Sequence, residues 1–206
     1  ACLTFVLRPA TNKPDPIEVD ANGRVTFFKG ASINNITQVT SHVTFTGLQI
    51  MEPEIFKRIP ENRFCGTTDE IFPAMIKDGL PVYGYTHQGY WNDMGNQKDY
   101  LQLHRDIFDG KILFENRQSF QTTQGPLIIP PVYIGKNCQI SGNAQVGPYV
   151  SLGDRCRLKH GAIVENSVIW NDVEIGVDAT ARNSVISHGV TIEDRQEVFD
   201  ELKGNQ

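Results

Sequence analysis

The sequence predicts an α/β part over about the first 110 residues, followed by a parallel β-helix over residues 131–192. Two observations support this fold class. In the C-terminal third an aliphatic residue returns every six positions, a period that belongs neither to an α-helix nor to a β-hairpin. In the N-terminal part, apolar runs of strand length alternate with segments that carry helix start and stop signals.

Apolar runs define the strands of the α/β part. Cys2 to Leu7 is almost wholly apolar, as expected for a strand that is buried on both faces. Asn22-Gly23 separates two short segments and predicts a β-hairpin. The hairpin arms and the remaining predicted strands are residues 17–20, 24–28, 43–51 and 81–87.

Three segments carry helix signals. A short helix is predicted over 53–59, with proline in its first turn. A second is predicted over 68–77, capped by a threonine and ended by Gly79. A third begins at Asn96, places its apolar residues on one side and closes at Gly110.

The C-terminal third is an internal repeat. Its period-six positions are Ile134, Ile140, Val146, Leu152, Leu158, Val164 and Trp170. Four places after each of the first six lies a small apolar residue: Cys138, Ala144, Val150, Cys156, Ala162 and Val168. Three hexapeptides form one coil of a β-helix, and stacked coils bury a continuous core. The repeat slips once, because Asn166-Ser167-Val168-Ile169 recurs 17 residues later as Asn183-Ser184-Val185-Ile186.

The four cysteines have no spacing typical of a zinc site. Cys138 and Cys156 lie 18 residues apart and are expected to stack inward in adjacent coils. Small core residues are the favoured interpretation of these two positions, and a disulfide or redox pair is the alternative. Free, reduced thiols in the cytoplasm are the expected state.

Composition excludes some function classes. The net charge is −5, from 19 basic and 24 acidic residues, and no basic stripe is present, which argues against nucleic acid as a partner. No apolar run approaches the roughly 20 residues of a membrane span. The chain does not open with a signal peptide, so a cytoplasmic protein without a membrane partner is expected.

The densest chemical signal is the segment from Gly89 to Asn96, where a strand ends, a glycine turn follows and a helix begins. Ligands bind at the carboxyl ends of strands in α/β sheets. Asp93 in this segment can hold Mg²⁺, a hard ion that prefers oxygen ligands. The alternative role of Asp93 is to cap the turn or the helix.

Gly89 to Tyr100 resembles the G-[YF]-W-x-D-[IM]-G-[TN]-x-x-x-[YF] segment of sugar-1-phosphate nucleotidyltransferases, and residues 44–53 and 71–85 resemble two further segments of that family. Among its subfamilies the chain is most similar to mannose-1-phosphate guanylyltransferase-like proteins. The resemblance implies the C-terminal half of a Rossmann-like nucleotidyltransferase domain, followed by a left-handed parallel β-helix of hexapeptide repeats. The predicted domains are residues 1–110 for the catalytic part, 111–130 for a linker, 131–192 for the β-helix and 193–206 for a tail with a short helix.

The family joins a nucleoside triphosphate to a sugar 1-phosphate, with Mg²⁺, and releases pyrophosphate. By position, Asp93 matches its second metal-binding aspartate and is the predicted catalytic residue. Thr46 and Gly47 match the strand that lines the sugar pocket, and Trp91 matches the aromatic residue beside the metal, or serves only in packing. Lys29 is the one plausible cation in the region of the family's E-K-P segment, or an ordinary exposed lysine.

The sequence departs from the family because it contains neither the G-G-x-G-T-R-L loop nor the first metal aspartate. We therefore expect a chain that lacks the nucleotide-binding half, makes a GDP-mannose-like product only together with that half, and does not turn over alone. One alternative is a non-catalytic regulatory or assembly subunit that forms homo-oligomers through the β-helix. A hexapeptide acyltransferase with His160 or His188 as general base is the weaker alternative.

Overall fold

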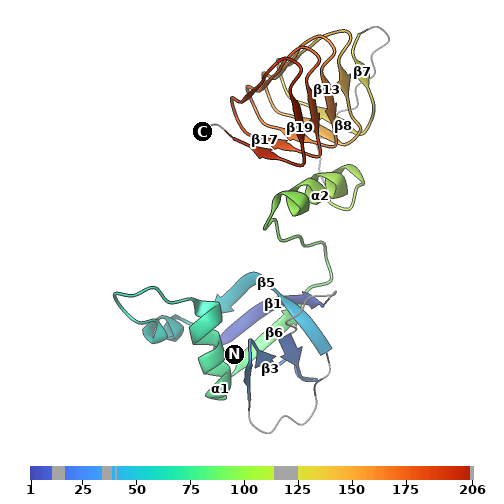
Figure 1. Ribbon diagram of the computed structural model, residues 1–206. Helices are drawn as coiled ribbons and strands as arrows, with labels where there is room; N and C mark the ends of the chain where they lie inside the picture. Colours follow the sequence, from blue (N-terminus) through green and yellow to red (C-terminus); the bar gives the residue numbers. More distant parts are fainter. Residues whose placement is uncertain (11–16, 34–38, 40, 114–124, 205–206) are drawn as a thin grey trace. The chain divides into compact units, whose positions relative to one another are not determined.

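The computed structural model describes residues 1–10, 17–33, 39, 41–113 and 125–204. Its contacts divide the chain into two compact units, Ala1–Trp91 and Asn92–Gln206, which are considered separately below (Figure 1). Most of the predicted linker over 111–130 lies outside the described residues. Among the described residues, no helix has the length and apolar character needed to cross a membrane.

A mixed six-stranded sheet with the order β4-β3-β2-β5-β1-β6 forms the first unit. β1 runs parallel to β6 and antiparallel to β5 (Figure 1). The hairpin predicted around Asn22-Gly23 is confirmed as β2 and β3. The strands are β1 (Leu3–Pro9), β2 (Ile17–Val19), β3 (Val25–Phe28), β4 (Ala31–Ser32), β5 (Ser41–Met51) and β6 (Val82–Thr86).

The apolar side chains of β1 give this unit its core. Leu3, Phe5 and Leu7 are fully buried, whereas the residues between them are half-buried. The prediction of a strand buried on both faces was therefore wrong, because alternate side chains point to opposite faces and one face holds the core. The Phe5 ring packs against the rings of Phe28, Phe45 and Phe72.

The three predicted helices are present with local differences. The first is a 3₁₀ turn, η1 (Pro53–Arg58), and the second consists of a π turn, η2 (Thr67–Ile71), that continues into α1 (Phe72–Lys77). Gly66 precedes the π turn, so no threonine caps it. The third helix is α2 (Gln97–Phe108), and Asn96 caps it because its side chain accepts a hydrogen bond from the Asp99 amide at 3.0 Å.

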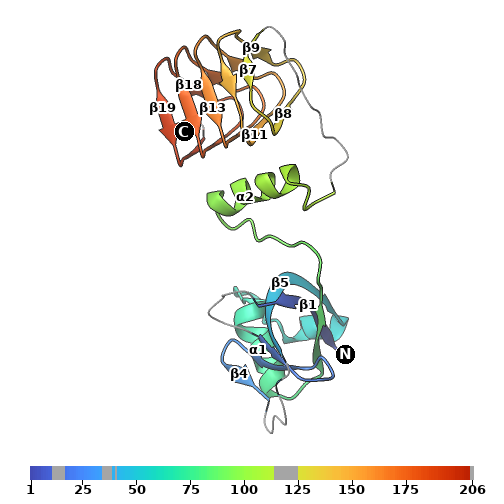
Figure 2. The same ribbon diagram turned by 90° about the vertical axis from the view of Figure 1, so that its right-hand side faces the viewer.

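The second unit is a parallel β-helix, which confirms the predicted fold class (Figure 2). Each coil adds a short strand to each of three sheets, with the orders β19-β16-β13-β10-β7, β20-β17-β14-β11-β8 and β18-β15-β12-β9. The strands are β7 (Leu127–Ile128), β8 (Val132–Ile134), β9 (Gln139–Ile140), β10 (Gln145–Val146), β11 (Val150–Leu152), β12 (Arg157–Leu158), β13 (Ile163–Glu165), β14 (Val168–Ile169), β15 (Glu174–Ile175), β16 (Thr180–Arg182), β17 (Val185–Ile186), β18 (Thr191–Ile192), β19 (Glu197–Phe199) and β20 (Leu202–Lys203).

The period-six residues form the core of the β-helix, with one exception at the slip. Leu152 and Val164 are fully buried, as the repeat predicts. Trp170, predicted to continue the series, is 45% exposed, whereas Ile169 is 1% exposed. The 17-residue coil moves the inward position back by one residue, so Ile169 fills the core and Trp170 points outward.

The predicted tail helix was also wrong. Residues 193–204 add a further coil, in which β19 and β20 pair with the preceding strands. Val198 lies in register with Ala181, one coil earlier, and is 1% exposed. Its burial extends the apolar core and favours strand over helix in this segment.

Helix α2 packs on the β-helix within the second unit. Leu101 forms a small apolar cluster with Val168 and Val185. Arg105 donates a hydrogen bond to the Asn166 side chain at 2.7 Å, and the His104 ring lies 3.1 Å from the Ser151 hydroxyl. The contacts thus divide the chain at 91/92, and the predicted boundaries at 110 and 131 stay predictions.

Candidate functional site

Strand β5 carries a bulge where the sugar pocket was predicted. Phe5 pairs with Gln49 and Leu7 with Phe45, so residues 46–48 of β5 face the single residue between them on β1. The Thr46 hydroxyl donates a hydrogen bond to the Val6 carbonyl at 2.8 Å and holds the bulge closed. Gly47 has a φ of 86°, a left-handed conformation that glycine adopts without strain.

Trp91 is anchored on this bulge. Its indole Nε1 donates a hydrogen bond to the Thr46 carbonyl at 3.1 Å. The Arg8 guanidinium donates to the Trp91 carbonyl at 3.1 Å, and its carbon lies 5.4 Å from the centre of the indole ring. A cation at this distance is attracted to the negative face of the ring. Three of the predicted residues, Thr46, Gly47 and Trp91, therefore lie together, with Arg8 as a fourth member.

Sequence reasoning missed Arg8 because the strand was predicted to end at Leu7. β1 extends to Pro9, which places Arg8 in register with Thr44 of β5. The Thr44 hydroxyl is buried, and no described residue gives it a hydrogen bond. The position of Arg8 directly after the apolar run was the signal that could have identified it as a candidate binding residue. Arg8 and Thr44 add a guanidinium and a hydroxyl, groups that suit a phosphorylated sugar.

Lys29 does not join this group. It lies in the turn after β3, a strand that β2 separates from β5. Lys29 forms an ion pair with Asp69, and their side chains are 47% and 64% exposed. A phosphate bound by Lys29 would therefore have to compete with the Asp69 carboxylate.

Asp93 lies at the beginning of the second unit and is exposed. Its backbone carbonyl accepts a hydrogen bond from the Gly95 amide at 2.8 Å, which forms the turn before α2. The preceding residue, Asn92, has a buried side-chain oxygen that receives no hydrogen bond from the described residues. This segment thus presents two oxygen groups that are adjacent in sequence.

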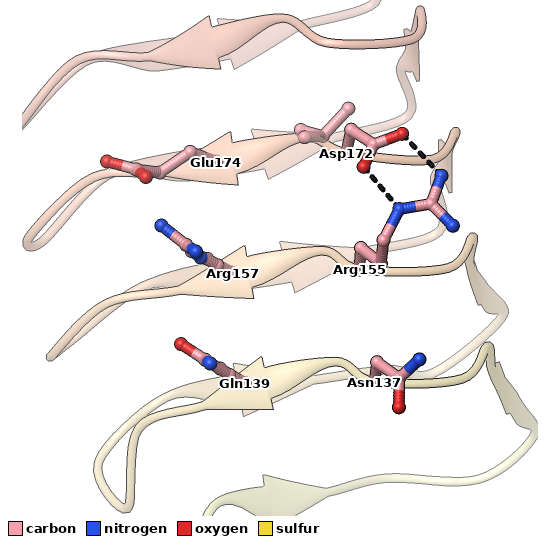
Figure 3. A pocket seen from close by; sticks show the side chains of 7 residues that line it. Asn137, Gln139, Arg155, Arg157, Asp172 and Glu174 are labelled. Atoms are coloured by element: carbon pink, nitrogen blue, oxygen red, sulfur yellow. Dashed lines mark hydrogen bonds and ion pairs between the residues drawn. The ribbon is translucent and has the colours of Figure 1, made fainter.

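A polar groove of about 370 Å³ follows the outside of the β-helix. Figure 3 shows its side chains in two rows across successive coils, with the Arg155 guanidinium bound to both oxygens of Asp172 at 2.5 and 2.7 Å. Its lining residues are Asn137, Gln139, Arg155, Arg157, Asp172, Val173 and Glu174. Sequence reasoning did not identify this groove, because its members are unremarkable polar residues until the coils stack.

Neither histidine of the acyltransferase alternative lies in that lining. The His160 ring lies 2.9 Å from the Asn143 side chain, and the His188 ring lies 3.4 Å from Asp172. Both rings are exposed, so their surroundings do not resemble a closed site for acyl transfer.

Comparison with known proteins identifies the family. The model of the nucleotidyl transferase family matches residues 13–110, and that of the GMPPB C-terminal domain matches residues 128–201. The chain belongs to the sugar-1-phosphate nucleotidyltransferase family. Within this family the first matched region contains the bulge, Trp91 and Asp93, and the second contains most of the β-helix.

Several curated nucleotidyltransferases are similar to the chain. A UTP--glucose-1-phosphate uridylyltransferase of Synechocystis sp. is 27% identical over 79% of the chain and 45% of its own length. A mannose-1-phosphate guanylyltransferase of Mycobacterium tuberculosis is 30% identical over 58% of the chain and 36% of its own length. A probable mannose-1-phosphate guanyltransferase of Schizosaccharomyces pombe is 24% identical over 83% of the chain and 45% of its own length. The chain thus spans less than half of each relative.

The family resemblance implies Mg²⁺, and the residues present fit it in part. Among the described residues no group of three or more His, Cys, Asp or Glu side chains could hold a metal ion. Asp93 would provide a carboxylate and Asn92 an amide oxygen. Mg²⁺ commonly takes one or two carboxylates and completes its coordination with water and substrate phosphate. The donor chemistry therefore suits a magnesium ion that binds together with a phosphorylated substrate.

Proposed function

We propose that the chain supplies the sugar 1-phosphate-binding part of a nucleotidyltransferase that forms an NDP-sugar and pyrophosphate from a nucleoside triphosphate. The observation that supports it is the hydrogen bond of Trp91 to the Thr46 carbonyl, with Arg8 stacked on the same indole. These contacts connect Trp91, which belongs to the family segment 89–100, with the strand predicted to line the sugar pocket. All three residues lie in the first unit.

In this reaction an oxygen of the sugar phosphate attacks the α-phosphorus, and pyrophosphate leaves. The protein acts mainly by holding the reactants in line and by neutralising charge. Bound Mg²⁺ would supply Lewis-acid stabilisation of the phosphate charge. Gly47 presents no side chain, so a sugar can approach the β5 backbone closely. Arg8 holds Trp91 in place through its hydrogen bond to the Trp91 carbonyl.

Mannose 1-phosphate and GTP are the substrates we propose. The match to the GMPPB C-terminal domain and the similarity to two mannose-1-phosphate guanylyltransferases support this choice. A uridylyltransferase among the relatives makes glucose 1-phosphate the natural comparison ligand.

The test is calorimetric titration of the chain with mannose 1-phosphate and with glucose 1-phosphate, in the presence of Mg²⁺. Mannose 1-phosphate should bind more tightly. Arg8→Met should weaken this binding by roughly 10- to 100-fold, since a hydrogen bond from a charged donor contributes about 1.5–3 kcal/mol. Arg58→Met is the matched control, because Arg58 is an exposed arginine of the same unit that pairs with Asp78. Equal affinities of the wild type and Arg8→Met would contradict the proposed site.

A non-catalytic assembly subunit of the same family is the second candidate. The ion pair of Lys29 with Asp69 favours this candidate, because Asp69 already binds the lysine that was predicted to bind the sugar phosphate. Asp69→Asn releases Lys29 and should raise the affinity for mannose 1-phosphate if the chain binds substrate. Absence of binding in both the wild type and Asp69→Asn, together with homo-oligomers in solution, would support the assembly subunit instead.

A further inference from the structure

Two cysteines lie directly above one another in the β-helix. Cys138 precedes β9 and Cys156 precedes β12, and the two strands pair in parallel with Gln139 opposite Arg157. The Gln139 amide donates a hydrogen bond to the Cys156 carbonyl at 2.9 Å, so the register includes the cysteines themselves. Neighbouring strands lie about 4.8 Å apart, which is within the range of about 4.4–6.8 Å between the Cα atoms of a disulfide.

Both thiols point in the same direction. Figure 3 shows the neighbours of Cys138 (Asn137 and Gln139) and of Cys156 (Arg155 and Arg157) as two stacked pairs on successive coils. Cys156 belongs to the buried core, and Cys138 packs against that core. Each thiol hydrogen-bonds a carbonyl of the following coil, Cys138 to Gly153 at 3.1 Å and Cys156 to Trp170 at 3.0 Å.

The two thiols differ in exposure and in acidity. Cys138 is partly exposed, whereas Cys156 is fully buried. Interaction with the neighbouring Cys156 thiol lowers the pKa of Cys138 to about 7, which favours the thiolate form that attacks peroxides. The same interaction, together with burial, raises the pKa of Cys156 and keeps that thiol protonated.

Packing alone does not require cysteine at these positions. Ala144 and Ala162 occupy the corresponding inward place in another corner of the same two coils, and they are 1% and 0% exposed. Alanine therefore fills this type of position without leaving it accessible to solvent. A partly exposed sulfur beside a buried one is the arrangement of an attacking and a resolving thiol.

We propose that Cys138 and Cys156 are a peroxide-reactive thiol pair, and that its oxidation to a disulfide links two successive coils of the β-helix. The Cys138 thiolate attacks a hydroperoxide, its O–O bond breaks, and Cys138 becomes a sulfenic acid while the peroxide is reduced to hydroxide or alkoxide. The Cys156 sulfur then attacks the sulfenic sulfur. The S–S bond forms, the S–O bond breaks, and water leaves with the Cys156 proton.

The test is to treat the chain with a few equivalents of hydrogen peroxide at neutral pH and to analyse a non-reducing tryptic digest by mass spectrometry. We expect peptide 137–155 linked to Cys156-Arg157, two hydrogens lighter than the sum of the peptides, and its loss after dithiothreitol. Cys156→Ala should leave Cys138 as a sulfenic acid that dimedone traps. Cys138→Ala should leave Cys156 as an unmodified thiol. Circular dichroism of both variants establishes that the β-helix is folded.

Cys65 is the internal control. Burial and the nearby Glu70 raise its pKa, so iodoacetamide at pH 7 should alkylate Cys138 before Cys65. The double variant Cys2→Ala/Cys65→Ala should form the 138–156 link as the wild type does. The proposal is overturned if wild-type Cys138 proceeds to sulfinic acid without the link, or if peroxide oxidises Cys2 and Cys65 and leaves Cys138 reduced.

Discussion

Removal of one buried hydroxyl, Ser167→Ala, tests how the β-helix accommodates its shortened coil. The Ser167 hydroxyl donates to the Glu165 carbonyl at 2.7 Å and accepts from the Ser184 amide at 3.1 Å. Both serines are fully buried. One coil later, the Ser184 hydroxyl repeats the pattern, donating to the Arg182 carbonyl at 2.7 Å and accepting from the Glu201 amide at 3.2 Å.

The structure sets the expected magnitudes. Ser167→Ala leaves the Ser184 amide buried without its partner, whereas the Glu165 carbonyl keeps a second hydrogen bond, from the Asn183 amide at 3.2 Å. An unsatisfied buried donor costs about 1–3 kcal/mol, so we expect a loss of about 2–3 kcal/mol in the free energy of unfolding. Ser184→Ala deprives only the Glu201 amide of its hydrogen-bond acceptor. Because Glu201 is exposed, water can replace the lost hydroxyl, and the free energy of unfolding should fall by only about 1 kcal/mol.

The assay is urea unfolding followed by hydrogen exchange and mass spectrometry, which separates peptides of the β-helix from those of the first unit. Ser187→Ala is the matched control, because Ser187 is only half-buried, and its effect should stay within about 0.5 kcal/mol. The reasoning is refuted if Ser167→Ala lowers the free energy of unfolding no more than Ser187→Ala does, or less than Ser184→Ala does. The stacked hydroxyls of Ser167 and Ser184 would then not stabilise the 17-residue coils.

Two further predictions concern α2 and the sheet. Burial lowers the pKa of His104, so the unfolded chain binds a proton more readily, and the free energy of unfolding should fall as the pH drops below about 6.5. Urea midpoints of the second unit between pH 7.5 and pH 5.5 measure this fall, which His104→Gln should reduce; an unchanged slope would contradict it. In the first unit, a Cβ on Gly84 would collide with the Leu7 side chain, so Gly84→Ala should cost about 1–3 kcal/mol. Gly142→Ala, whose Cβ meets no atom within 4 Å, is the control in thermal unfolding, and equal losses would refute the packing argument.

Much of the fold could be predicted because its signals are local. Asn22-Gly23 specifies the hairpin, Asn96 and Gly110 delimit the third helix, and the period of six residues specifies the β-helix. Two errors arose where the register of the β-helix depends on neighbouring coils. The outward turn of Trp170 follows from a slip of one residue, and residues 193–204 form strands because the preceding coil offers an edge for pairing.

The candidate site was only partly accessible to the same reasoning. Thr46, Gly47 and Trp91 could be named from their segments, and the structure brings them together through hydrogen bonds. Arg8 was not predicted, and the ion pair of Lys29 could not be foreseen, because Asp69 is 40 residues away in the sequence. A charged side chain acquires its role from its partners, which are known only after the chain has folded.

The architecture, an α/β part followed by a β-helix, was predictable from the amino-acid sequence, as was the family, whose motifs occur in three short segments. Backbone conformation and hydrophobic periodicity depend on residues that are close in the sequence, so both can be predicted from one amino-acid sequence. Which charged side chains contact one another became known only from the folded chain. The folded chain stacks Arg8 on Trp91 and pairs Lys29 with Asp69, because folding brings residues that are distant in the sequence within bonding distance.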